Sequence, residues 1–131
     1  MMVAGETSGA VTLNAFREQM ASYRRAFDQE AAKLKDSQLV LVRLKNLFLK
    51  LDATERKAVE QVLAEWVLSD DENVRFDALA LIDYFKIKGA THALEKLAVR
   101  LAASGAVSAP FELSKIKRVI AHIGGTSRVG Q

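Results

Sequence analysis

Hydrophobic residues recur at helical spacing along most of this chain. From Thr12 to about Asp36, apolar side chains lie three or four positions apart, which predicts one stripe along a long amphipathic helix. Two hypotheses fit this stripe: it packs across the rest of the domain, or its larger members form a coiled-coil seam between two copies of the chain. The stripe consists of Leu13, Phe16, Met20, Tyr23, Phe27, Ala31 and Leu34.

The next segment, Leu39–Leu51, is apolar on nearly all sides. Its length and the spacing of its later leucines favour a helix over a strand. Arg43 and Lys50 fall on one narrow polar stripe together with Asn46. We therefore expect this helix to meet solvent or a partner along that stripe and to be buried elsewhere.

Two acidic corners predict the starts of the next helices. Asp52 and Glu55 have the spacing of a capping box, in which each side chain accepts from the backbone N–H of the other residue. Ser69 and Glu72 have the same spacing and predict a second box. The two corners delimit a helix over 53–68 and open another over 72–87.

The remaining helix boundaries are predicted from turn residues. The helix ending near Ile87 is apolar on two opposite faces, so we expect neighbours on both sides. Gly89 predicts its left-handed ending, and Thr91 predicts the cap of a helix over 91–103. Pro110 suits the first turn of a last helix, because a missing N–H costs nothing there.

Composition supports an all-α fold and places one domain between two flexible ends. The 131 residues are 50% hydrophobic and include a single proline, which favours long helices over a many-turned β fold. We expect a flexible leader over 1–11, one helical domain over 12–124 and a flexible tail over 125–131. The absence of cysteine excludes disulfides and thiolate catalysis, and without a signal-like or membrane-spanning stretch it indicates a cytoplasmic protein.

The sequence contains no pattern that indicates an enzyme, a cofactor or a metal. His92 and His122 are the only histidines, and neither has a histidine or carboxylate four positions away on its predicted helix. The acidic residues near Asp70 match no calcium loop and are explained as helix caps. We therefore predict a protein that is not an enzyme and binds no cofactor or metal.

Two predicted helix pairs, 53–87 and 91–123, start about 38 residues apart, a period typical of solenoids of paired helices. The corner Leu68–Arg75, followed by Ala78 and Ile82, resembles the HEAT repeat, in which an acidic turn precedes a helix that begins Val-Arg. The resemblance covers about residues 52–87. It implies a right-handed stack of antiparallel helix pairs, with the arginine paired to an aspartate of its own or a neighbouring corner. It also implies protein binding on the second helices.

We accordingly predict a protein–protein interaction module, one version of which is a toxin-neutralising (immunity) protein. The alternative is a nucleic-acid-binding protein with a basic rim, which the net charge of +3 permits without favouring. The expected contact surface combines residues of the middle helix with charged residues flanking it. These residues are Phe76, Asp77, Asp83 and Tyr84, with Arg43, Lys50, Lys115 and Arg118.

Overall fold

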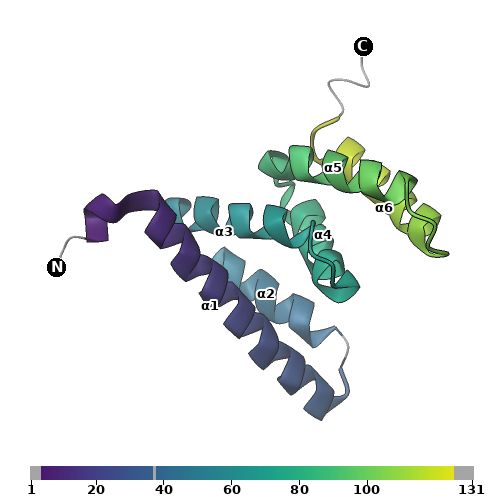
Figure 1. Ribbon diagram of the computed structural model, residues 1–131. Helices are drawn as coiled ribbons and strands as arrows, with labels where there is room; N and C mark the ends of the chain where they lie inside the picture. Colours follow the sequence, from purple (N-terminus) through teal and green to yellow (C-terminus); the bar gives the residue numbers. More distant parts are fainter. Residues whose placement is uncertain (1–3, 37, 126–131) are drawn as a thin grey trace. The chain divides into compact units, whose positions relative to one another are not determined.

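The computed structural model describes residues 4–36 and 38–125, and every regular element in these ranges is a helix (Figure 1). The predicted all-α class is therefore confirmed. Two compact units divide the chain, Met1–Val62 and Leu63–Gln131, so the division falls inside the third helix. The prediction of one domain over 12–124 stays a prediction. Among the described residues, no helix has both the length and the apolarity needed to cross a membrane.

The described residues of the first unit form two complete helices and the start of a third. They are α1 (Ala4–Leu34), α2 (Leu39–Leu49) and α3 (Ala53–Trp66). α1 begins at Ala4 rather than at Thr12, so residues 4–11 of the expected leader are helical. Residues 1–3 of that leader lie outside the described ranges.

A left-handed turn ends α1 and lets α2 pack beside it (Figure 1). Lys35 has a φ of 54°, and the N–H of Asp36 donates to the carbonyl of Ala31 at 2.9 Å, as in a Schellman ending. Across the pair, Arg43 donates two hydrogen bonds to Glu30, at 3.2 and 3.0 Å. These contacts hold α1 and α2 together beyond their apolar packing.

The apolar stripe of α1 is only partly buried. Met20 and Ala31 belong to the core, whereas Tyr23 is 39% and Leu34 is 62% exposed. Tyr23 stacks on Phe27 with the ring centroids 6.0 Å apart. The use of this stripe as a seam between two copies stays a prediction.

α2 is less buried than its sequence indicated. Its core side chains lie one helical turn apart at Val40, Leu44 and Phe48. Val42 and Leu49, however, are 47% and 59% exposed, so the expectation that only the polar stripe of Arg43 and Lys50 meets the surface is wrong. An apolar helix packed mainly on one neighbour leaves its far side uncovered whatever its composition.

In the second unit, residues 63–125 form the last part of α3, three further α-helices and two short helical turns. These elements are α4 (Glu72–Phe85), η1 (Lys88–Ala90), α5 (Thr91–Ala102), α6 (Ala109–Ile120) and η2 (Ala121–Gly125). α5 packs closely on α6, and α4 packs on α6 and η2. The core side chains that are almost fully buried are Leu63, Val67, Leu81, Ile82, Leu94, Leu97, Ile116 and Ile123.

Of the two predicted capping boxes, only the first forms. Asp52 and Glu55 exchange side-chain-to-backbone hydrogen bonds at 2.9 and 2.8 Å. At the second corner the cap is Asp71, whose carboxylate accepts from the N–H of Asn73 at 2.9 Å. Ser69 instead accepts from the N–H of Asp71 at 3.0 Å, so the prediction of a box between Ser69 and Glu72 is wrong. Asp71 takes the cap because its extended backbone sits directly before the first helical residue.

The end of α4 also differs from the prediction. The left-handed residue is Lys86, with a φ of 52°, and the N–H of Ile87 donates to the carbonyl of Ile82 at 3.0 Å. Gly89 has no positive φ, and Thr91 donates its hydroxyl to the carbonyl of Lys88 instead of capping α5. Burial of Ile87, which is 3% exposed, stabilises this earlier ending.

The last helix, α6, begins where the sequence predicted and is followed by a further helical turn. Pro110 lies in the first turn of α6, as expected. The chain continues past Ile120 as η2, which ends at Gly125. Residues 126–131 of the predicted tail lie outside the described ranges.

Candidate functional site

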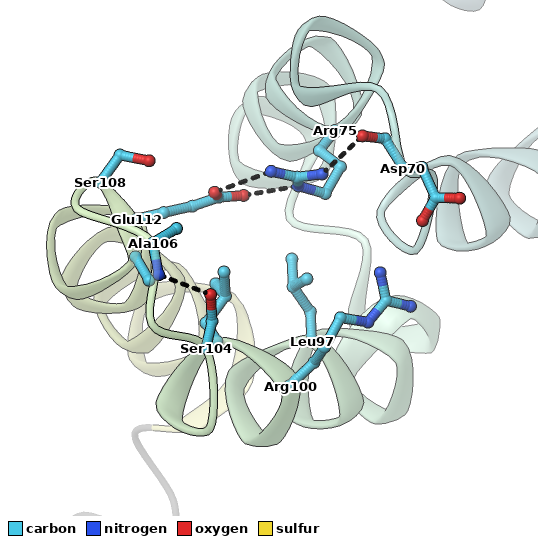
Figure 2. Close-up of a pocket in the computed structure, with 10 residues that line it drawn as sticks. Asp70, Arg75, Leu97, Arg100, Ser104, Ala106, Ser108 and Glu112 are labelled. Atoms are coloured by element: carbon cyan, nitrogen blue, oxygen red, sulfur yellow. Dashed lines mark hydrogen bonds and ion pairs between the residues drawn. The ribbon is translucent and has the colours of Figure 1, made fainter.

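A hollow of about 220 Å³ lies between the start of α4, the end of α5 and the first turn of α6. Its charged lining residues are Asp70, Arg75, Arg100 and Glu112 (Figure 2). Figure 2 shows Arg75 reaching across the hollow to Glu112. The two side chains are only 15% and 12% exposed, so they form a largely buried ion pair.

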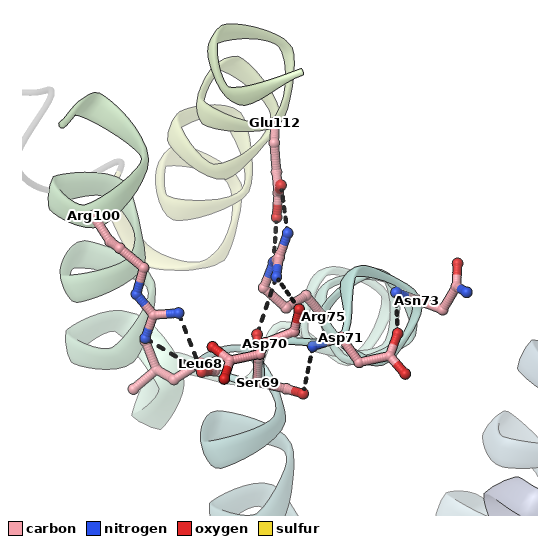
Figure 3. Close-up of polar contacts among 8 residues, drawn as sticks. All are labelled: Leu68, Ser69, Asp70, Asp71, Asn73, Arg75, Arg100 and Glu112. Atoms are coloured by element: carbon pink, nitrogen blue, oxygen red, sulfur yellow. Dashed lines mark hydrogen bonds and ion pairs between the residues drawn. The ribbon is translucent and has the colours of Figure 1, made fainter. Parts of the chain in front are cut away.

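Arg75 uses all three nitrogens of its guanidinium at this corner (Figure 3). Nε and Nη2 donate to the carboxylate of Glu112 at 2.7 and 3.0 Å, while Nη1 donates to the carbonyls of Ser69 and Asp70 at 3.0 and 3.3 Å. The hydrogen bond with Glu112 is the main cause that raises the pKa of Arg75 above its ordinary value. The partner is thus a glutamate of the neighbouring corner, and the aspartate that the resemblance implied is not used.

A second arginine satisfies the carbonyl of Leu68, just beyond the end of α3. Nη1 and Nη2 of Arg100, which lies on α5, donate to it at 3.3 and 3.2 Å (Figure 3). The corner is therefore held by arginines from two different helices. Its charges serve the fold, and we do not assign the adjoining hollow as a binding site.

α4 and α6 run parallel, as three cross-helix contacts show. The sequence separation stays nearly constant, at 37 or 39 positions, along α4 and along α6 with its continuation η2, whereas antiparallel helices would have a separation that changes steadily. The contacts join Arg75 to Glu112, Phe76 to Lys115, and Asp83 to His122. The separation is close to the period of about 38 residues between the two predicted helix pairs.

A shallow groove follows the line between these parallel helices. It is lined by Phe76, Leu79, Ala80 and Asp83 from α4, and by Lys115, Arg118 and Val119 from α6. The groove holds about 180 Å³, which is less than the roughly 300–1,000 Å³ of pockets for small-molecule ligands. A single side chain of a partner fits this volume better than a cofactor does.

One end of the groove carries an exposed aromatic cluster. Phe76 is 52% and Phe111 is 74% exposed, and both rings lie near the ammonium group of Lys115. The distance from Nζ to the ring centroid is 4.1 Å for Phe76 and 6.0 Å for Phe111. The cation attracts both ring faces and so orients two large apolar surfaces that remain in contact with water.

The other end carries a charged network around His122. Nδ1 of His122 is hydrogen-bonded to Oδ1 of Asp83, and Nε2 lies 3.0 Å from Nζ of Lys86. An ammonium group can only donate and a carboxylate can only accept, so the two contacts together fit a neutral ring with its proton on Nδ1. Asp83, Arg118 and His122 also line an open depression that continues the groove.

The structure brings together four of the eight predicted contact residues. Phe76, Asp83, Lys115 and Arg118 all line the groove. The other four do not line it. Asp77 and Tyr84 lie on α4, where Tyr84 is 59% exposed and packs edge-on against Phe85, while Arg43 and Lys50 belong to the first unit, where Arg43 pairs with Glu30.

Sequence reasoning missed three residues of this region: Lys86, Phe111 and His122. Phe111 precedes Lys115 by one helical turn, so the spacing of four positions was a signal that both share a face of α6. The separation of 39 positions between Asp83 and His122 was a second signal, because it nearly equals the repeat period.

In the described part of the chain, no three histidine or carboxylate side chains are grouped closely enough to hold a metal ion. A scan against protein-family models and searches of curated proteins and of solved structures found no match to this chain. The resemblance to a HEAT repeat therefore stays a prediction, and the groove is the feature of the molecule that bears most on function.

Proposed function

We propose that this chain is a non-enzymatic module that binds another protein through the groove between α4 and α6. The observation that most supports the proposal is the exposure of Phe76 and Phe111, whose rings both lie near the ammonium group of Lys115. Aromatic side chains at the centre of an interface often carry much of its binding energy. Two phenyl rings held in water beside an apolar groove are suited to that role.

The groove provides an anchoring point rather than a complete interface. Burying one partner side chain the size of leucine contributes about 1.5–3 kcal/mol, which is too little for stable association alone. The partner must therefore also cover the exposed faces of α4 and α6 around the groove. Tyr84, on α4, is a candidate for this outer contact because of its exposure.

The proposal extends to the wider architecture, a right-handed stack of antiparallel helix pairs with a long amphipathic helix at the N-terminus. The close packing of α5 on α6 across a short loop supports one antiparallel pair. The parallel course of α4 and α6 supports their assignment as second helices of successive pairs. In HEAT-like stacks the second helices line the binding surface.

We also propose a cytoplasmic location and, as one version of the function, a toxin-neutralising protein. The support is the cysteine-free composition and an analogy with small helical immunity proteins. A toxin gene next to the gene for this chain, with growth rescued on co-expression, would support this version. Rescue that persists after Phe76→Ala would contradict a role for the groove in it.

Site-specific crosslinking tests the docking surface directly. A photoreactive amino acid replaces Phe76 or Phe111 in the full chain, which is expressed and irradiated in its native host. Val99 on α5 is the control position, because it is 72% exposed and does not line the groove. We expect one discrete adduct from positions 76 and 111 and none from position 99. An equal or stronger adduct from position 99 would overturn the assignment.

A further inference from the structure

The arginines of this chain differ in whether a carboxylate neutralises them. Arg43 and Arg75 each bind a glutamate through two hydrogen bonds. Arg118 lines the groove, yet within the described residues its guanidinium has no ion pair or hydrogen bond. The guanidinium of Arg118 lies beside an apolar surface and binds no anion among the described residues of this chain. Its planar set of N–H donors can therefore bind the carboxylate of another molecule.

The groove also has more positive than negative side chains around it. Lys115 and Arg118 line it, and Lys86 lies beside His122 at one end. Among the described residues that line it, Asp83 has the only carboxylate. That carboxylate is already bonded to His122. Lys115 is positioned by its two aromatic neighbours and by no acidic residue among those described. An approaching segment therefore meets a positive potential over an apolar floor.

We propose that the groove binds an acidic, apolar-anchored segment of the partner protein. In this arrangement one apolar side chain packs on Phe76 and Leu79, and a carboxylate of the same segment pairs with Arg118. The inference rests on the proposed function and adds the chemistry of the partner. Arg118 is then the residue that selects an acidic segment over a basic one.

A nucleic acid is a less suitable occupant of this groove. Phosphate-driven binding needs several cations converging along a charged track, whereas here two cations flank an apolar floor. Asp83 lines the same groove and would lie close to any phosphate placed there. Leu79, Ala80 and Val119 offer contact to an apolar side chain and no hydrogen bond to a base or a phosphate.

The test uses the full chain and synthetic peptides, followed by NMR and by fluorescence anisotropy. The probe is a labelled peptide of about 16 residues made of glutamate, leucine and alanine, which spans about 24 Å as a helix. A second peptide has lysine in place of glutamate, and a third probe is single-stranded oligothymidine. We expect saturable shifts of α4 and α6 amide signals with the acidic peptide, at concentrations up to about 1 mM.

Charge reversal then assigns the effect to one residue. Arg118→Glu should weaken binding of the acidic peptide by about tenfold or more, and Arg118→Lys should retain most of it. Lys96→Glu is the matched control, because Lys96 is exposed on α5, does not line the groove and gives the same change in charge. Unchanged circular dichroism and melting temperature show that each variant is folded.

Several results of these binding measurements would contradict an acidic partner segment. Absence of saturable shifts with the acidic peptide, equal binding of the lysine peptide, or equal weakening by Lys96→Glu would each overturn the inference. Tighter binding of oligothymidine that weakens steeply with salt would replace it with nucleic-acid binding. A further result is that crosslinking at Phe76 succeeds while Arg118→Glu has no effect on the binding of any probe. That result would support the groove as the docking surface and contradict an acidic partner segment.

Discussion

Arg75 and Arg118 both lie where α4 faces α6, and they are used in opposite ways. Arg75 is clamped by Glu112 and by two backbone carbonyls, and its side chain is largely buried. Arg118 is exposed, and its guanidinium has no ion pair or hydrogen bond to other described residues. The comparison separates charge that holds the two helices together from charge that remains available to a partner.

The difference follows from where each arginine sits in the parallel register. Arg75 is opposite an acidic residue of the next corner, at a separation of 37 positions. The residues of α4 that line the groove are Phe76, Leu79, Ala80 and Asp83. The first three have no carboxylate, and the carboxylate of Asp83 is hydrogen-bonded to His122 rather than to Arg118. One end of the helix pair is thus closed by an ion pair, while the middle keeps an apolar groove with a cationic edge.

Removal of the ion pair between Arg75 and Glu112 should have the largest effect on stability. Glu112→Gln leaves the buried guanidinium of Arg75 without its anion, and we expect the free energy of unfolding to fall by about 3 kcal/mol. Trp66 is the only tryptophan and lies in the second unit, so urea denaturation followed by its fluorescence measures the change. The matched control is Glu30→Gln, whose pair with Arg43 is far more exposed and should cost much less.

The sign of the pH dependence also follows from this pair. A pKa of Arg75 that is raised in the folded state contributes stability below the unfolded value and loses it only when pH rises through the folded value. The loss caused by Glu112→Gln should therefore be the same at about pH 7 and about pH 10. A Glu112→Gln variant as stable as the wild type at both values would show that the pair does not close this corner.

The cap of α4 gives an effect of intermediate size at the same corner. Asp71→Ala removes the acceptor for the N–H of Asn73 and should lower the free energy of unfolding by about 1 kcal/mol. Glu72→Ala is the control, since Asp71 and not Glu72 supplies the cap, and should change stability by less than about 0.5 kcal/mol. Equal losses, measured by the same denaturation, would favour the box first predicted between Ser69 and Glu72.

The features that sequence could predict are those determined within a few residues. Helical periodicity located the helices, and the Asp52–Glu55 box formed as expected because both partners lie in one turn. Between Ser69 and Glu72 the sequence contains several acidic and hydroxyl residues that could cap α4. The backbone conformation before α4 places Asp71 at the cap position. The end of α4 depended on burial of Ile87, which is a property of the packed core.

The sequence predicted several residues of the groove but not the contacts between its two helices. Phe76, Asp83, Lys115 and Arg118 were predicted as residues of the middle helix and charged residues flanking it, and the structure places all four in one groove. The pairing of Asp83 with His122 depends on two helices lying side by side in register. A period of about 38 residues implies that register, but only after the second helices are known to be parallel neighbours.

The variant with the smallest expected effect on stability gives the most direct test of the difference between Arg75 and Arg118. Arg118→Ala removes a charge that no described carboxylate neutralises, so the free energy of unfolding should change by less than about 0.5 kcal/mol. A slight stabilisation is consistent with the comparison, because Lys115, three positions before Arg118 on the same helix, repels it. A loss as large as that of Glu112→Gln, in the same urea titration, would give Arg118 a structural role like that of Arg75. The groove would then have no free cation to offer a partner, and the contrast between the two arginines would disappear.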